Sequence, residues 1–301
     1  MRRFCRERGD RETERDHGDP MKAHLECIPC LLKQSLNATR VVTDDQAVQE
    51  KVLKSVMKEL LDAPVDYVPP EIARTIYSIV DDITGCDDPY KSLKMEYNRI
   101  GMGMYPYLKD IVDKSDDRLF TAVRLAIAGN IIDFGADIQF DVEETIRDVL
   151  TKKFAINDYP LFVESLEESE NILYLADNAG EVAFDRILLE EIMDYANVVY
   201  AVKNKPIIND ATIDDAIFCG IDSIAEIVTT SDTPGTILER CGPEFVSIFR
   251  SADVIISKGQ GNYETLSEEA GNIFFLLLAK CPVIADDLGV KIGDAVLLSA
   301  P

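Results

Sequence analysis

Residues 172–182 have the sequence ILYLADNAGEV, in which an apolar run ends in a polar turn and a helical pattern follows. The run Ile172–Ala176 has the length of a buried β-strand. Gly180 permits a tight turn after it, and the following residues have helical spacing. Open α/β sheets bind ligands at the carboxyl ends of their strands, which is where Asp177 and Asn178 would lie.

Asp177 and Asn178 suit two different roles at this turn. Both carry oxygen donors that suit Mg²⁺, Mn²⁺ or a similar cation. Both are also favoured N-caps of helices, and an isolated Asp-Asn pair is more often a cap than a metal site. The rest of the chain has to decide between these roles.

The composition limits the classes of partner. The chain has 301 residues with 47% hydrophobic composition, and this length and composition allow one large core or two modest ones. Its formal net charge is −24. The negative charge argues against nucleic-acid and anionic-membrane partners, because phosphate binding requires clustered Lys and Arg. A small phosphorylated molecule is still an acceptable partner where a few local cations or a bound metal offset the field.

The sequence favours a cytoplasmic protein. It contains no run of about 18 or more apolar residues, so no membrane span is expected. Residues 1–20 hold six Arg and six Asp or Glu and resemble no signal peptide, so we expect a disordered leader, with Met21 as an alternative start. Seven cysteines, an odd number without a signal, fit a reducing compartment. The sequence leaves the oligomeric state open.

The hydrophobic period changes near residue 166. Residues 21–166 have apolar positions every three or four residues, which predicts a helical domain without strands. Residues 167–301 have short β-rich runs that alternate with helical segments, which predicts βαβ units. The expected strands are Ile172–Ala176, Val198–Val202, Ile224–Val228, Val254–Ser257, Ile273–Leu278 and Ala295–Ser299. We therefore predict an α/β fold, in which a mostly parallel sheet with helices on both faces follows an α-helical N-terminal region.

Several common catalytic motifs are absent from the sequence. It contains no P-loop, no G-x-S-x-G and no H-E-x-x-H. His17 and His24 are its only histidines, so histidine acid–base catalysis has almost no candidate. Gly259-Gln260-Gly261 resembles the start of a dinucleotide fingerprint, but Glu264 stands where the third glycine belongs. This signal is weak.

Asp210 follows the second expected strand. Neighbouring parallel strands bring their carboxyl-end loops together, which makes Asp210 a candidate third metal ligand beside Asp177 and Asn178. An N-cap of the next helix is the alternative role for Asp210.

The fourth and fifth strands are followed by cationic and amide groups. Lys258 precedes the segment Gly259-Gln260-Gly261-Asn262, whose N–H groups would form an anion-binding nest, although a plain turn is equally compatible. Lys280 follows the fifth strand. Oxygen ligands, ammonium groups and amides at one sheet edge are what phosphoryl chemistry requires, since cations neutralise the charge and a metal activates water.

Asn130 and Asp133 are polar residues in an otherwise apolar helix. They lie three residues apart and therefore on one face. Buried polar groups need partners, so both are candidates for lining a cleft. The alternative is a satisfied C-terminal turn before Gly135.

Cys27 and Cys30 form a C-x-x-C motif, which suits a redox pair or half of a zinc site. The motif does not follow a strand, which argues against a thioredoxin-like arrangement. His24 together with Cys86 or Cys281 would be needed to complete a zinc site, and no second C-x-x-C exists. Buried structural cysteines are the alternative.

Four motifs together resemble one known family. These are Asp-Asn-Ala-Gly-Glu at 177–181, Lys-Gly-Gln-Gly-Asn at 258–262, Gly-Asn-Ile-Ile-Asp-Phe-Gly at 129–135 and Cys-Ile-Pro-Cys at 27–30. In this order they resemble the damage-control phosphatases, also known as domain of unknown function 89, and most of all the prokaryotic branch that carries the C-x-x-C. The resemblance runs from about Met21 to the C-terminus.

The resemblance implies a Rossmann-like α/β sandwich that carries a phosphatase site. It implies a divalent metal, Mg²⁺, Mn²⁺, Co²⁺ or Ni²⁺, held by Asp177, Asn178 and Asp210. It implies that the substrate-binding residues are Asn130, Asp133, Lys258, Gly259, Gln260, Gly261, Asn262 and Lys280. The eukaryotic branch's Arg-Thr-x-Lys pattern is only partly matched, since Leu278-Ala279 precede the final lysine.

The leading hypothesis is a metal-dependent phosphatase that hydrolyses small phosphate monoesters, such as sugar phosphates or damaged metabolites, with a metal-activated water. Asp177, Asn178, Asp210 and Lys258 would be its catalytic residues. The alternative is a non-catalytic ligand-binding or zinc- or redox-sensing protein that uses Cys27 and Cys30. A shared metal–phosphate site accounts for all the polar strand ends, so we predict that Asp177 and Asn178 are metal ligands first and caps second.

Overall fold

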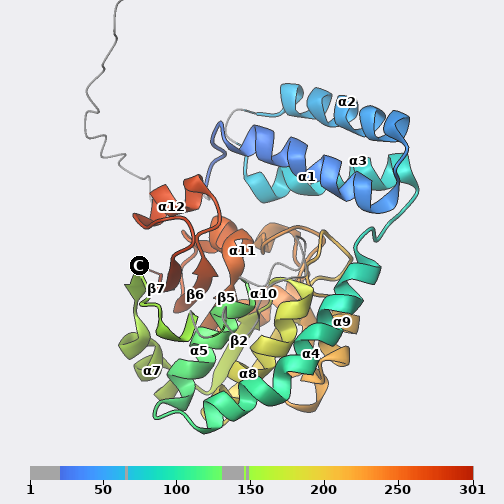
Figure 1. The fold of residues 1–301 in the computed structure, drawn as a ribbon. Helices are drawn as coiled ribbons and strands as arrows, with labels where there is room; N and C mark the ends of the chain where they lie inside the picture. Colours follow the sequence, from blue (N-terminus) through green and yellow to red (C-terminus); the bar gives the residue numbers. More distant parts are fainter. Residues whose placement is uncertain (1–20, 65–66, 131–145, 147–148, 301) are drawn as a thin grey trace, which may run out of the picture.

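A seven-stranded sheet forms the centre of the computed structural model, which describes residues 21–64, 67–130, 146 and 149–300 (Figure 1). The strand order is β1-β7-β6-β5-β2-β3-β4, and neighbours are parallel except for the antiparallel pair β6 and β7. The strands are β1 (Ile156–Asn157), β2 (Asn171–Leu175), β3 (Asn197–Val202), β4 (Glu226–Thr229), β5 (Val254–Lys258), β6 (Ile273–Leu278) and β7 (Ala295–Ser299). The predicted mostly parallel α/β sheet is confirmed.

All six predicted strands are present, each within two residues of its expected bounds. The sequence missed β1, which pairs with β7 through Val296 and Leu297. The expectation that residues 21–166 hold no strand is therefore wrong at β1. A strand of two residues is too short to show any alternation of apolar and polar positions.

Helices cover both faces of the sheet, as predicted. Side chains alternate between the faces of a strand, so Ile172 and Tyr174 of β2 belong to one core and Leu173 and Leu175 to the other. The first core is covered by α4 (Lys91–Asp113), α5 (Arg118–Gly129), α7 (Tyr159–Glu167), α8 (Val182–Ile192) and α9 (Ile213–Phe218). The second is covered by α10 (Pro243–Ser251), α11 (Gly259–Leu266) and α12 (Pro282–Leu288). Short 3₁₀ turns also occur in the described connections, namely η1 (Ala179–Glu181), η2 (Ile221–Ser223) and η3 (Leu238–Arg240).

Helices α1 (Cys27–Val42), α2 (Gln46–Asp62) and α3 (Pro69–Thr84) form a separate layer, shown in blue in Figure 1. Apolar residues at helical spacing, such as Ile72, Ile76 and Val80 of α3, give these three helices a core of their own. The loop after β3 enters this core through Ile207.

The predicted domain boundary at residue 166 stays a prediction. The packing places α4 and α5 on α8 and the sheet, whereas α1, α2 and α3 pack on one another. The expected leader 1–20 lies outside the described residues. Within the described part of the chain, no helix is both long and apolar enough to cross a membrane.

Candidate functional site

The polar turn after β2 is bonded to the loop after β3. The N–H of Ala179 donates to the carbonyl of Asn209 at 2.8 Å, and the N–H of Ala211 donates to the carbonyl of Asp177 at 2.8 Å. These bonds form an isolated antiparallel bridge between Asn178 and Asp210. The backbone therefore brings together the three residues that we predict to be metal ligands.

The capping role that competed with metal binding does not fit the geometry of either loop. Asn178 occupies the N-cap position of η1, but its side chain makes no capping hydrogen bond. Thr212 is the N-cap of α9 and forms a capping box with Asp215, so Asp210 is not the cap. The side chains of Asn178 and Asp210 are therefore not committed to capping.

Two amides and two carboxylates form a cluster at the end of β2. Asn130 Nδ2 donates to Asp177 Oδ2 at 2.8 Å and to Glu181 Oε1 at 2.7 Å. Asn178 Nδ2 donates to the same two oxygens at 3.1 and 2.7 Å. Glu181 is a site residue that the sequence analysis missed, because we assigned it only to the start of a helix. Its place in the Asp-Asn-Ala-Gly-Glu motif was the available signal.

Burial and mutual repulsion disfavour the ionised forms of the carboxyl groups at this site. Burial, together with the nearby carboxylates of Glu181 and Asp210, raises the pKa of Asp177 well above its usual value. Burial raises the pKa of Asp210 to about 6, although Lys203 and Lys94 oppose the change. A bound cation would offset the repulsion among these carboxylates.

Helix α4 contacts the loop that carries Asp210 through buried polar side chains. Lys94 Nζ is buried, pairs with Asp215 Oδ2 at 3.0 Å and donates to the carbonyl of Asp210 at 3.3 Å. Asn98 Nδ2 donates to Asp215 Oδ1 at 2.7 Å. The contact between α4 and Asp210 depends on tertiary packing, which no local sequence pattern contains.

Lys258 lies beneath the cluster and is fully buried. Its ammonium contacts Asp185 Oδ1 at 2.6 Å and Glu181 Oε2 at 3.2 Å. Burial alone would lower the pKa of Lys258, but Asp185 and Glu181 raise it above its usual value. The hydroxyls of Tyr174 and Tyr200 also donate to Asp185. Lys258 therefore neutralises charge under the site, and its predicted contact with substrate phosphate stays a prediction.

The segment after Lys258 forms the first turn of α11 rather than the expected glycine-rich turn. Gly259 has a φ of 78°, and a Cβ at this position would lie 1.9 Å from Asp177 Oδ2, so only glycine allows this approach. Asn262 is buried, where its Nδ2 donates to the carbonyls of Ala176 and Lys258 at 3.1 and 2.8 Å. It fixes the start of α11 against the end of β2.

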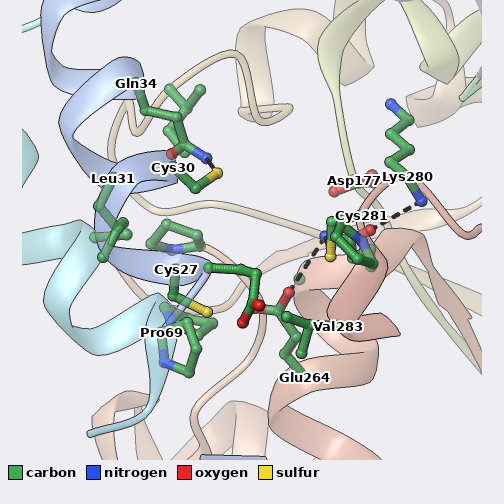
Figure 2. Close-up of a pocket in the computed structure, with 18 of the residues that line it drawn as sticks. Cys27, Cys30, Leu31, Gln34, Pro69, Asp177, Glu264, Lys280, Cys281 and Val283 are labelled. Carbon is green, nitrogen blue, oxygen red and sulfur yellow. Dashed lines mark hydrogen bonds between the residues drawn. The ribbon is translucent and has the colours of Figure 1, made fainter. Parts of the chain in front are cut away.

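A cavity of about 370 Å³ opens beside the cluster, between α1, α3, α11 and the start of α12 (Figure 2). The predicted site residues that line it are Asn130, Asp177, Gln260, Gly261, Lys280, Cys27 and Cys30. Gln260 joins two of the walls, because its Oε1 accepts the Lys280 N–H at 3.2 Å and its Nε2 donates to Cys281 Sγ at 3.5 Å. Asp133 lies outside the described residues. The structure thus places Gln260, Gly261, Lys280 and the C-x-x-C in one cavity, whereas five other predicted site residues do not line it: Asn178, Asp210, Lys258, Gly259 and Asn262.

The residues of the cluster fit a hard divalent cation. Carboxylate and amide oxygens are the donors that Mg²⁺ and Mn²⁺ prefer. Asn130 Oδ1 is buried and has no hydrogen-bond partner, so it is one oxygen left for a ligand. Among the described residues, no three His, Cys, Asp or Glu side chains form a ready metal-binding group, so a cation here would also need amide oxygens.

Residues 23–296 match the family model of the damage-control phosphatase ARMT1-like domain. The chain belongs to the damage-control phosphatase family. The damage-control phosphatases of Pyrococcus horikoshii and Archaeoglobus fulgidus are each 37% identical to it, over 92% of this chain and 98% of theirs. An uncharacterized protein of Methanocaldococcus jannaschii is 40% identical over 94% of this chain and 97% of its own length. The homologues support a phosphatase role.

A crystal structure of a damage-control phosphatase relative has the same fold. This protein of the domain-of-unknown-function-89 family, from Pyrococcus horikoshii, superposes with a TM-score of 0.85 at 36% identity, covering 93% of this chain and 100% of that one. The family and the fold class that the sequence predicted are both confirmed.

Proposed function

We propose that this damage-control phosphatase family member is a metal-dependent phosphatase of small phosphate monoesters. The observation that carries the proposal is the buried amide–carboxylate cluster at the ends of β2 and β3, which opens on a cavity that Lys280 lines. Family membership favours an enzyme over the non-catalytic alternative that the C-x-x-C suggested.

Asp177, Asn178 and Asp210 would hold the cation, with Asn130 Oδ1 as a further oxygen. When bound, a divalent cation neutralises phosphate charge and makes water acidic enough to attack near neutral pH. Asp177 or Asp210 would orient the attacking water. The Glu181 carboxylate would hold the amides of Asn130 and Asn178 in place, since it accepts a hydrogen bond from each.

Phosphate would lie between Lys280 and the start of α11. The first N–H groups of a helix point outward and attract anions, and Gln260 and Gly261 in the first turn of α11 line the cavity. Lys280 adds positive charge on the same wall. Lys258 would act through Glu181, because its ammonium already contacts Asp185 and Glu181.

The size and charge of the molecule favour a small substrate. A cavity of about 370 Å³ fits a phosphorylated metabolite of the size of a sugar phosphate. A net charge of −24 would repel an extended polyanion such as a nucleic acid. The part of the cavity between α1 and α3 would receive the organic portion of the substrate.

The test is phosphate release from a panel of sugar phosphates by chelator-treated protein, with Mg²⁺, Mn²⁺, Co²⁺ or Ni²⁺ added back. We expect activity to need a metal and to fall by about 100-fold or more in Asp177→Asn and Asp210→Asn. Asp222→Asn, an exposed aspartate in η2, is the matched control and should keep full activity. Metal-independent hydrolysis, or full activity of Asp177→Asn, would refute the proposal.

A further inference from the structure

The first turn of α1 carries two thiols that border the substrate cavity. Cys27 is the first residue of α1, and Cys30 lies one turn further along the helix. Residues three apart in an α-helix have Cα atoms about 5 Å from each other and share a face. Disulfides span Cα distances of roughly 4.4 to 6.8 Å, so the two sulfurs can be joined without unwinding α1.

The two thiols differ in access to solvent. Cys30 is exposed, and its sulfur accepts a hydrogen bond from Gln34 Nε2 at 3.3 Å. Cys27 is half-buried, and its sulfur accepts the backbone N–H of His24 at 3.4 Å. Burial raises the pKa of the Cys27 thiol, and the Glu264 carboxylate raises it further. Cys30 is therefore the thiol that meets a reagent first, and Cys27 is placed to react second.

A third thiol lies on the opposite wall of the cavity. Cys281 precedes α12, and Figure 2 shows it across the cavity from the C-x-x-C, next to Lys280. Among the described cysteines, Cys86, Cys219 and Cys241 do not line the cavity. The three thiols therefore lie on two walls of the same cavity.

We propose that Cys27 and Cys30 form a reversible dithiol–disulfide site in the wall of the substrate cavity, oxidised by a low-molecular-weight disulfide. The Cys30 thiolate attacks one sulfur of the reagent, which forms a mixed disulfide and releases one thiol. The Cys27 thiolate then attacks the Cys30 sulfur, which forms the Cys27–Cys30 bond and releases the second thiol. The two protons of the protein thiols leave with the two released thiols, so the exchange balances.

Oxidation changes a wall that the substrate would contact. Drawing Cys30 towards Cys27 breaks the hydrogen bond to Gln34, whose Oε1 also accepts the hydroxyl of Tyr77 on α3 at 3.3 Å. Loss of this hydrogen bond therefore affects the contact between α1 and α3, and these are the two helices of the layer that border the cavity. The acidic cluster lies on other elements and keeps its contacts.

The experiment follows the cysteine peptides of the reduced full-length chain during incubation with oxidised glutathione. Aliquots are alkylated, digested and analysed by mass spectrometry. We expect a Cys27–Cys30 disulfide in the wild type and in Cys281→Ser, reversed by dithiothreitol. Cys27→Ser should collect glutathione on Cys30 faster, by on the order of ten-fold, than Cys30→Ser collects it on Cys27.

A Cys30–Cys281 disulfide as the main product, no disulfide in the wild type, or equal trapping rates in the two serine variants would overturn the proposal. Cys86→Ser is the control for the loss of one half-buried thiol outside the cavity, and it should behave like the wild type. The readout is the mass of the peptides, so the result is independent of the proposed phosphatase activity.

Discussion

Gly259→Ala tests how closely the start of α11 approaches the acidic cluster. The residue has a φ of 78°, a conformation that costs a side-chain-bearing residue about 1–2 kcal/mol. The new Cβ would also lie 1.9 Å from Asp177 Oδ2. Because unbonded carbon and oxygen atoms stay about 3.3 Å apart, the carboxylate would have to move by about 1.4 Å.

Gly289→Ala is the matched control for this substitution. Gly289 ends α12 with a φ of 66°, but a Cβ there meets nothing within 4 Å. Both variants should lose about 1–2 kcal/mol in urea unfolding from the backbone conformation, and Gly259→Ala should lose more because of the displaced carboxylate.

Only Gly259→Ala should lose activity. A displacement of about 1 Å in a catalytic group costs about 100-fold, so kcat/KM for a sugar phosphate should fall by at least that factor. Gly289→Ala should keep wild-type kcat/KM. If Gly259→Ala stays within about three-fold of Gly289→Ala, then Asp177 is either not catalytic or not held in this position.

Two further predictions concern a buried ion-pair cluster and a partly exposed ion pair. Lys258→Met should lower the free energy of unfolding by about 3–5 kcal/mol, because it leaves the carboxylates of Asp185 and Glu181 buried and uncompensated. A loss below about 1 kcal/mol in urea unfolding would contradict the ion-pair assignment. Arg74 lowers the pKa of Asp232 through a two-bond contact at 2.9 and 2.8 Å. The contribution of this carboxylate is therefore present above its unfolded pKa, near 3.9, and is lost as the pH falls through its lower folded pKa. Asp232→Asn should cost about 0.5–1 kcal/mol at pH 7 and nothing below that range, and a gap of equal size at both pH values would count against the contact.

The sequence predicted the strands from local pattern, and it predicted one edge of the site from the topology that those strands imply. The apolar run of β6, Ile273–Leu278, is buried at all six positions and was bounded correctly. Asp210 was placed beside Asp177 because the carboxyl ends of neighbouring parallel strands meet, which is a property of topology rather than of spacing.

The remaining features depend on contacts that no local pattern contains. The role of Lys258 depends on Asp185, which lies 73 residues away in the chain, and on the depth at which the two meet. Glu181 was visible in the motif, but only folding reveals that it accepts hydrogen bonds from Asn130 and Asn178. The strand β1 was missed because two residues cannot show a period.

The cavity lies between parts of the molecule that have separate hydrophobic cores. The strands carrying Asp177 and Asp210 pack in the sheet, whereas the wall formed by α1 and α3 rests on its own core around Ile76 and Val80. Substitutions in that smaller core should reshape the end of the cavity that we propose for the organic group without disturbing the strands that carry the proposed metal ligands. The residues proposed to hold the metal and the residues proposed to select the substrate therefore rest on different cores. A lineage of such proteins could acquire new substrates by altering three helices while inheriting the chemistry unchanged.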